Sequence, residues 1–360
     1  MLTLGEPAPW FTARCTTNPT YQFDTVAGRY VVLCFLGSAA DPAGQRILAE
    51  IEQNGARFDV ENFCFFGVTG NPDDERLARV QQRWPGVMYF WDFDLAISRL
   101  YGVLSADGKV YQRLTVVLDQ ALRVLNILPV SDPATHVPTL LRYLETLPPM
   151  RSLDLPAPIL VVPNIFTPQF CRKLIGLYQQ HGGEETGFMK QIDGKTVPVL
   201  NYNYKRRSDY IIAEQDVIQE AENRLRRVLV PEIKKVFHFD ASHIERYIVA
   251  CYDAETGGFF RRHRDHTTKG TAHRRFAVTI NLNAEEYEGG DLRFPEYGIR
   301  TYRAPTGGAV VFSCALAHEV HKMIRGKRYA FLPFLYDDEA AKIREANLPF
   351  LDCTKVHVQS

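Results

Sequence analysis

Apolar runs alternate with amphipathic stretches along the first 150 residues. Nearly continuous apolar runs predict strands at residues 30–36, 62–69, 114–118 and 124–129. Apolar residues at helical spacing predict helices at residues 46–53, 74–83 and 138–147. Strands and helices that alternate in this order are typical of an α/β layer around a central sheet.

A proline-rich stretch without periodicity follows at residues 149–156, and we interpret it as an interdomain linker. After a strand at residues 160–162, the pattern predicts a helix over residues 168–180. Thr167 can cap the amino end of this helix, and Pro168 fits its first turn. A second, longer helix is predicted within residues 216–237.

From residue 244 onwards the pattern changes to strand after strand. These strands are predicted at residues 244–252, 276–283, 291–294, 309–313 and 329–336. Two helices followed by many strands of antiparallel type predict a closed or sandwiched β-structure with helices on one side. The chain is therefore predicted to hold domains at residues 1–148 and 157–338, with a carboxy-terminal tail at residues 339–360.

Charge and composition exclude several classes of partner. The chain has 42 Lys and Arg residues and 42 Asp and Glu residues, so no overall field recruits nucleic acid or an anionic membrane. No apolar stretch approaches the ~20 residues that a membrane helix needs, and the opening MLTLGEPAPWF lacks the features of a secretory signal. The seven Cys residues contain no CxxC pair, which argues against a disulfide framework. We expect a cytoplasmic protein with reduced thiols.

A candidate metal site stands out in the second half. His263 and Asp265 are separated by one residue, so on an extended backbone both side chains point to the same face. His318 follows the apolar run 310–312 and can supply a third ligand from another strand. Two His and one carboxylate on one face of a metal leave the other positions open, which is the geometry of non-haem Fe(II) oxygenases. His and carboxylate also suit zinc, which remains an alternative.

The context of this motif carries a family resemblance. Tyr252 lies upstream, the glycine-containing stretches 289–294 and 305–308 lie between the two His residues, and Arg328 follows His318 at ten residues. The segment from about residue 157 to 336 resembles the 2-oxoglutarate/Fe(II) dioxygenases of the prolyl-hydroxylase-like group. This resemblance implies a double-stranded β-helix, or jelly-roll, fold with supporting helices.

The resemblance also implies roles for the site residues. His263, Asp265 and His318 match the iron ligands, Arg328 matches the residue that pairs with the distal carboxylate of 2-oxoglutarate, and the Tyr252 hydroxyl helps to hold that carboxylate. Arginine can grip a carboxylate with two parallel hydrogen bonds. The implied reactants are Fe(II), 2-oxoglutarate and O2, with ascorbate as a reductant. The implied reaction is hydroxylation of a C–H bond, in a prolyl residue of a peptide or in a small amino-acid-like molecule.

Further polar residues are weighed against ordinary structural roles. We expect His266 and His321 to be solvated or to lie outside the ligand set, and His273 to be a loop residue. Thr279 and Asn281 alternate with apolar residues and could face the lumen near the cosubstrate. The basic runs at residues 205–207 and 261–264 are expected to be solvated faces. Some of their arginines could steer an acidic substrate: Arg206, Arg207, Arg261 and Arg262.

Residues 1 to about 148 resemble the peroxiredoxin and thioredoxin-like group. The resemblance rests on residues 5–11, 27–33, 100–103 and 115–119, together with Asp94. A peroxidase of this group needs a thiolate at the amino end of the first helix, near an arginine. The corresponding loop, residues 37–44, contains no Cys. The domain is therefore expected to be redox-inactive and to serve docking, substrate presentation or homodimer formation.

The remaining cysteines leave two alternatives open. Cys34 and Cys64 lie in predicted strands and are expected to be buried and inert, whereas Cys15 lies in a loop and has no assigned role. One alternative is a thiol-peroxidase-like redox protein that uses Cys15 or Cys64. The other is a non-enzymatic binding protein in which both domains are degenerate, which the complete set of iron-site residues disfavours.

Overall fold

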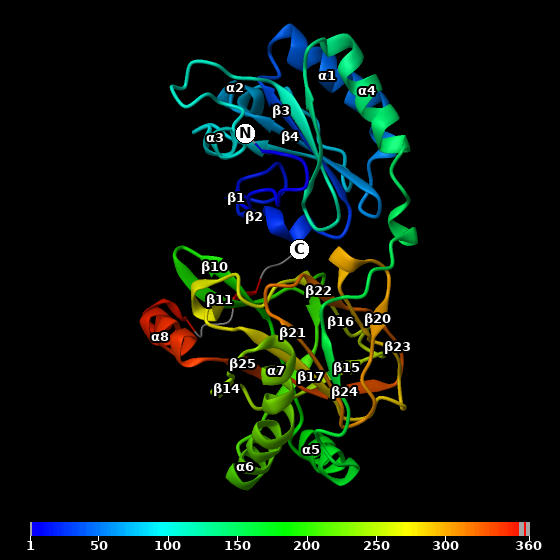
Figure 1. Ribbon diagram of the computed structural model, residues 1–360, viewed down its shortest axis with the longest axis vertical. Helices are drawn as coiled ribbons and strands as arrows, with labels where there is room; N and C mark the ends of the chain where they lie inside the picture. Colours follow the sequence, from blue (N-terminus) through cyan, green and yellow to red (C-terminus); the bar gives the residue numbers. More distant parts are fainter. Residues whose placement is uncertain (1, 353–355, 358–360) are drawn as a thin grey trace. The chain divides into compact units, whose positions relative to one another are not determined.

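The computed structural model describes residues 2–352 and 356–357. The chain divides into two compact units, one formed by Met1–Leu155 with Pro295–Ile299 and the other by Pro156–Phe294 with Arg300–Ser360 (Figure 1). Each unit has a hydrophobic core of its own. None of the helices in the described residues is long and apolar enough to cross a membrane.

The first unit is built on a five-stranded sheet in the order β5-β4-β3-β6-β7. The strands are β3 (Tyr30–Gly37), β4 (Phe63–Thr69), β5 (Val87–Trp91), β6 (Leu114–Leu118) and β7 (Val124–Pro129). β3, β4 and β5 run parallel to one another, β6 runs antiparallel to β3, and β7 runs antiparallel to β6. The predicted strands correspond to four of these five. β5 was not predicted, although its sequence is an apolar run.

Both faces of this sheet are buried, which explains why its strands are nearly continuous apolar runs. In β3, Val31, Leu33 and Phe35 enter one core, whereas Val32 and Leu36 enter the other. The second core is covered by helices α1 (Pro42–Gln53) and α4 (Pro133–Glu145), which lie side by side (Figure 1). Because side chains alternate between the two faces of a strand, β3 contributes to the cores on both sides of the sheet.

All three predicted helices in this unit have different bounds, and α1 begins at Pro42, four residues before the predicted start at residue 46. The helix predicted over residues 74–83 is wrong in extent, because α2 (Pro72–Arg76) ends early and Ala78 has a φ of 48°. α4 begins five residues before the predicted start, at Pro133, and Asp132 caps it. Pro138, the predicted start, lies inside the helix. A short helix, α3 (Ala96–Leu100), was not predicted.

The second unit contains two main sheets of mostly short antiparallel strands. The larger sheet has the order β14-β25-β17-β24-β15-β13-β9, with β21 pairing with both β17 and β8. Its strands are β8 (Leu160–Val162), β9 (Glu184–Glu185), β13 (Ser208–Ile211), β14 (His243–Glu245), β15 (Ile248–Asp253), β17 (Phe276–Asn281), β21 (Ala309–Ser313), β24 (Lys327–Phe331) and β25 (Phe334–Tyr336).

The smaller sheet has the order β12-β16-β22-β19-β20. Its strands are β12 (Lys205–Arg206), β16 (Phe259–His263), β19 (Leu292–Arg293), β20 (Thr301–Tyr302) and β22 (His318–Val320). A hairpin of β10 (Phe188–Ile192) and β11 (Lys195–Leu200) and a pair of β18 (Glu288–Gly289) and β23 (Met323–Arg325) complete the strands, apart from β26 (Val356–His357), which pairs with β11.

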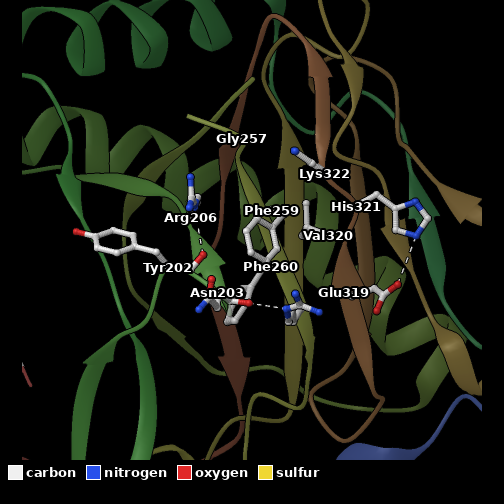
Figure 2. Close-up of a pocket in the computed structure, with 11 residues that line it drawn as sticks. Tyr202, Asn203, Arg206, Gly257, Phe259, Phe260, Glu319, Val320, His321 and Lys322 are labelled. Atoms are coloured by element: carbon white, nitrogen blue, oxygen red, sulfur yellow. Dashed lines mark hydrogen bonds and ion pairs between the residues drawn. The ribbon is translucent and has the colours of Figure 1, made fainter. Parts of the chain in front are cut away.

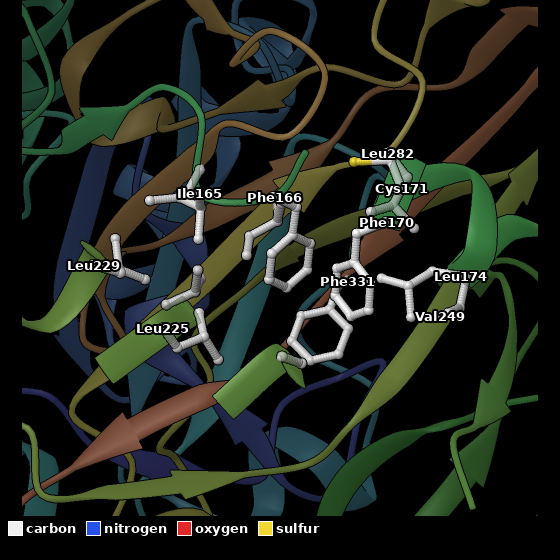
Figure 3. Close-up of a cluster of buried hydrophobic side chains, with 14 of the residues drawn as sticks. Ile165, Phe166, Phe170, Cys171, Leu174, Leu225, Leu229, Val249, Leu282 and Phe331 are labelled. Atoms are coloured by element: carbon white, nitrogen blue, oxygen red, sulfur yellow. The ribbon is translucent and has the colours of Figure 1, made fainter. Parts of the chain in front are cut away.

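Helices cover one face of the larger sheet. α5 (Pro168–His181) begins as predicted, with the Thr167 hydroxyl accepting a hydrogen bond from the Phe170 amide at 3.3 Å. α6 (Gln215–Arg224) continues through a single π-helical turn into α7 (Val230–Phe237). Together they bury a core against the sheet, in which Phe166 packs edge-on against Phe331 of β24 (Figure 3).

Two predicted strands are each broken into two. Residues 244–252 divide into β14 and β15 at Arg246, which has a left-handed φ of 72°. Residues 329–336 divide into β24 and β25 around Pro333, which lacks an amide proton for the ladder. The two breaks meet, because Arg246 Nε donates to the carbonyl of Leu332 at 3.1 Å. Helix α8 (Asp338–Asn347) follows, within the residues predicted as a tail.

Candidate metal centre

Two adjacent antiparallel strands bring the candidate histidines together. β16 and β22 pair with Phe260 opposite Val320 and His263 opposite His318, with a bulge between Phe260 and His263. The ring centroids of His263 and His318 lie 4.2 Å apart. Bulges of this kind re-aim side chains at the end of a ladder, and here the bulge aligns the two imidazoles that the sequence separates by 55 residues (318 minus 263).

Asp265 completes the cluster from the turn that follows β16. Its amide donates to the Cys314 carbonyl at 3.0 Å, which fixes the backbone beyond the strand. One carboxylate oxygen lies 3.6 Å from His263 Nε2 and the other lies 3.4 Å from His318 Nε2. One ligand atom from each residue fits within 4.8 Å of the other two. The sequence predicted the convergence of His263 and Asp265 from their spacing, and it predicted His318 as a third ligand from a later strand.

The hydrogen bonds of the imidazoles suit a metal. His263 Nδ1 lies 2.8 Å from the Arg261 carbonyl, and His318 Nδ1 lies 3.1 Å from the Leu316 carbonyl. Because a carbonyl only accepts, each Nδ1 carries the proton and each Nε2 presents a lone pair toward Asp265. This is the outer hydrogen bonding that normally orients metal-bound histidines. The residues therefore fit a metal ion on the side where the three ligand atoms converge.

Burial and neighbouring charges set the protonation states that ligation needs. Burial, with a contribution from His318, lowers the pKa of His263 to about 3. Burial alone would raise the pKa of Asp265, but His318 and His263 outweigh it and the pKa of Asp265 is lowered. A neutral His263 imidazole and an ionised Asp265 carboxylate are the forms in which these groups bind metals.

A buried cation lies on the larger sheet. Arg328 of β24 is 2% exposed and stands opposite Tyr252 of β15, with its guanidinium carbon 5.4 Å from the Tyr252 ring centroid. Its Nη1 donates to the Gly290 carbonyl at 2.6 Å. Its Nε is buried and has no hydrogen-bond partner among the residues that the structure describes. A buried arginine with spare donors fits an anionic ligand.

A second set of buried charges was missed by the sequence analysis. Lys205 Nζ donates to the Thr186 hydroxyl at 3.0 Å and to the Gly187 carbonyl at 2.6 Å. Arg207 pairs with Asp209 at 2.7 Å, and its Nη1 lies 3.5 Å from the Tyr252 hydroxyl. Burial, followed by repulsion from Arg207, holds the pKa of Lys205 well below its usual value.

The expectation that both basic runs are solvated is therefore wrong. Lys205, Arg207 and Arg264 are buried, whereas Arg206 and Arg261 are exposed. The signal that could have found the buried set is alternation, because Lys205, Arg207 and Asp209 are spaced by two residues and can share one face of extended chain.

The other polar candidates lie outside the ligand cluster. His266 Nδ1 contacts the Cys314 carbonyl at 3.0 Å, and His321 Nε2 lies 3.4 Å from Glu319. His273 lies in a turn, as expected, but its side chain is buried and contacts Glu245 at 2.5 Å. Asn281 is buried and donates to the Ala304 carbonyl at 2.7 Å.

The first unit lacks an activated thiolate in its described residues. In the loop before α1, Asp41 accepts a hydrogen bond from the Gly44 amide at 2.8 Å and forms an ion pair with Arg113. The arginine near the amino end of the helix is therefore paired with a carboxylate and not with a thiol. Cys15, Cys34 and Cys64 are buried, and burial raises the pKa of Cys34 to about 11.

Two parts of the chain match known families. Residues 247–336 match the 2OG-Fe(II) oxygenase superfamily, and residues 4–127 match the AhpC/TSA family. Comparison with curated proteins gave no match. These family matches confirm the predicted succession of a peroxiredoxin-like part and a 2-oxoglutarate- and Fe(II)-dependent dioxygenase part. They support a hydroxylase and give less support to a thiol peroxidase or a binding protein. The superfamily implies Fe(II), 2-oxoglutarate and O2.

Several solved structures are similar to either part. A prolyl-4-hydroxylase from Pseudomonas putida is 18% identical over 49% of this chain and 91% of its own, with a TM-score of 0.38. A prolyl hydroxylase from Trichoplax adhaerens, solved with a hypoxia inducible factor peptide fragment, is 18% identical over 52% and 86%, with a TM-score of 0.40. AhpC from Mycobacterium tuberculosis is 19% identical over 40% and 92%, with a TM-score of 0.34.

Proposed function

We propose that this 2-oxoglutarate-dependent Fe(II) dioxygenase binds its iron through His263, Asp265 and His318. The observation that carries the proposal is the convergence of the three ligand atoms within 4.8 Å, with both imidazole Nδ1 atoms held by carbonyls. The bound metal, with 2-oxoglutarate and O2, supplies the oxidising power for inserting oxygen into a C–H bond. The protein's part is to fix ligand geometry and to orient both organic molecules.

We propose the double-stranded β-helix as the fold that frames this site. Its support is the order in which the chain visits the two sheets. β15 lies in the larger sheet and β16 in the smaller, β17 returns to the larger, and β21 and β22 again divide between the two. Strands that alternate in this way form two facing layers, and the iron ligands lie on neighbouring strands of the smaller one.

We propose Arg328 and Tyr252 as the residues that hold the distal carboxylate of 2-oxoglutarate. Arg328 is buried, its Nε has no partner among the described residues, and Tyr252 lies directly opposite it. A buried guanidinium and a phenolic hydroxyl suit a carboxylate in a site that excludes water. The Arg207 Nη1 lies 3.5 Å from the Tyr252 hydroxyl, so a second cation lies close to the ring.

The substrate that we propose is a C–H bond of a prolyl residue in a peptide, or of a small amino-acid-like molecule. The peroxiredoxin-like part is proposed to present this substrate or to join two copies of the chain. The reason is that Asp41, and not a thiolate, caps the amino end of α1 and pairs with Arg113. Sedimentation of the full chain tests for the homodimer, because a homodimer doubles the mass of 41.0 kDa.

The test is succinate formation by full-length protein purified without oxygen. The protein receives Fe(II), 2-oxoglutarate and ascorbate, then O2, with a peptide pool or cell extract as a source of substrate. His318→Ala removes one proposed ligand. His321→Ala is the matched control, because it removes a histidine three residues away that contacts Glu319 instead.

We expect succinate from the wild type and from His321→Ala, and none from His318→Ala. Metal content is measured in parallel, since loss of iron from His318→Ala identifies the cause. Iron bound without succinate formation in the presence of substrate pools would show that the cluster is structural. Preferential retention of zinc with no effect of 2-oxoglutarate would favour the zinc alternative.

A further inference from the structure

A pocket of about 480 Å³ lies on the second unit, beside the strands that carry the histidines (Figure 2). Its polar and aromatic walls come from the loop before β12, from β16 and from the turn after β22. The side chains that matter here are Tyr202, Arg206, Phe259, Arg261, His321 and Lys322. A volume of this size suits a small molecule.

The strand register places this pocket mainly on the face of the smaller sheet opposite the iron ligands. Phe260 is buried and stacks on His263, with ring centroids 3.6 Å apart, so the two share one face. Phe259 precedes Phe260 and must point the other way. Arg206 pairs with Phe259 across the strands, and the guanidinium carbon of Arg261 lies 5.7 Å from the Phe259 ring centroid. His263, Asp265 and His318 do not line the pocket, whereas Phe260 and Val320 on the ligand face do.

The charges of the pocket do not cancel. Its one carboxylate, Glu319, is engaged elsewhere: Arg293 lies at 2.6 Å, His321 at 3.4 Å and Arg262 at 3.9 Å. Arg206, Arg261 and Lys322 have no ion pair among the described residues. Three cations without a carboxylate partner thus surround the pocket.

Both arginines are held in place by neutral groups. Arg206 donates from Nε to the Tyr202 carbonyl at 3.1 Å and from Nη1 to the Thr256 carbonyl at 3.0 Å. Arg261 donates from Nε to the Asn203 carbonyl at 2.5 Å. Carbonyls fix the guanidinium planes and leave their full charges in place. Fixed donors lose less conformational entropy when a ligand binds, which favours affinity.

We infer that this pocket binds a small molecule through an oxyanion, a phosphate or a carboxylate, held by Arg206 and Arg261, with an apolar part packed on Phe259. Lys322 adds a long-range attraction from the rim. Arginine pairs favour such anions because their planar donors match two oxygens at once. Phe260, which also lines the pocket, stacks on His263 and so places the occupant one ring away from an iron ligand.

The experiment is calorimetric titration of the full chain with phenyl phosphate, benzoate and inorganic phosphate. The first two probes share a ring and differ in the anion, and inorganic phosphate lacks the ring. Arg206→Gln, Arg261→Gln and Lys322→Gln each remove one charge of the pocket. Arg172→Gln is the matched control, because Arg172 is an exposed arginine on α5, outside the pocket.

We expect saturable binding of phenyl phosphate or benzoate, tighter than that of inorganic phosphate. Either arginine substitution should weaken it by about tenfold or more, as loss of a hydrogen bond to a charged group does. Lys322→Gln should weaken it less and lower its dependence on salt. The aromatic probe that binds more tightly identifies the anion that the pocket prefers, phosphate for phenyl phosphate and carboxylate for benzoate.

Three results would overturn the inference. They are the absence of saturable binding, equal affinity in the pocket variants and in Arg172→Gln, and loss of binding in His318→Ala, which would place the probe at the metal centre. The Lys322 side chain is exposed and makes no hydrogen bond among the described residues. Lys322→Gln therefore still tests the pocket if an arginine variant fails to fold. Binding that survives in His318→Ala supports the pocket whether or not the proposed iron site holds.

Discussion

Tyr252 and Arg328 face each other across β15 and β24, with the Arg328 guanidinium carbon 5.4 Å from the centre of the Tyr252 ring. The arrangement leaves the buried Nε of Arg328 without a partner among the described residues. Buried donors are rarely left unpaired, because each costs about 1–3 kcal/mol. The unpaired donor supports the proposed role of Arg328 and Tyr252 in holding a carboxylate.

Replacing Arg328 by Gln should weaken 2-oxoglutarate binding without loss of iron. Loss of a charge-assisted contact is worth about 2–3 kcal/mol, or roughly 30- to 150-fold in dissociation constant. Titration of the iron-loaded protein with 2-oxoglutarate measures this change. Arg325→Gln is the control, because Arg325 is exposed and pairs only with Glu288 at 3.0 Å. Equal affinity of the two variants would contradict the assignment.

Glu245 should make stability depend on acid pH. Burial acts to raise its pKa, but hydrogen bonds from His273 and Arg274 outweigh burial and hold the pKa well below its usual 4.5. The folded state therefore binds fewer protons than the unfolded state. The resulting stabilisation is present above about pH 4.5 and is lost as the pH falls below that value.

The corresponding measurement is denaturant unfolding of Glu245→Gln between pH 7 and pH 3. At pH 7 the variant leaves Arg274 without its buried partner and should lose about 3 kcal/mol. The difference from wild type should shrink below about pH 4.5, as Glu245 becomes protonated in the unfolded state. Glu339→Gln serves as control, since the Glu339 side chain is 76% exposed and its pair with Lys342 should contribute little. A difference that stays constant with pH would refute this account.

Asp41 should stabilise the first unit through its contacts at α1. Asp41→Ala removes the cap on the Gly44 amide and the ion pair with Arg113, and should cost about 1–2 kcal/mol. Urea unfolding of the full chain, monitored by a signal that reports on this unit, measures the loss in free energy of unfolding. Asp107→Ala removes an exposed carboxylate of the same unit and should change stability by less than about 0.5 kcal/mol.

The first unit should consume no peroxide. Its cysteines in the described residues are buried, and the position beside Arg113 is occupied by Asp41. A peroxide-consumption assay with a dithiol reductant should give no turnover above that of buffer. Turnover that disappears on Cys15→Ser or Cys64→Ser would revive the thiol-peroxidase alternative. Unchanged turnover in both variants would instead point to chemistry at the metal centre.

The sequence alone determined the elements whose signal is local. Continuous apolar runs located β3, β4 and β6, because a strand buried on both faces needs apolar side chains at every position. The spacing of His263 and Asp265 predicted their convergence, because residues separated by one share a face of extended chain. Thr167 and Pro168 predicted the start of α5, since capping involves only neighbouring residues.

Only the tertiary structure decided what depends on distant partners. The left-handed turn at Arg246 is stabilised by the Leu332 carbonyl, 86 residues away in sequence, so no local pattern could locate that break. Lys205 and Arg207 look like surface residues in the sequence. They are buried where Thr186 and Gly187 accept hydrogen bonds from Lys205 and where Asp209 pairs with Arg207. The free energy of burying a charge depends on the partners that the fold supplies, and composition does not encode those partners.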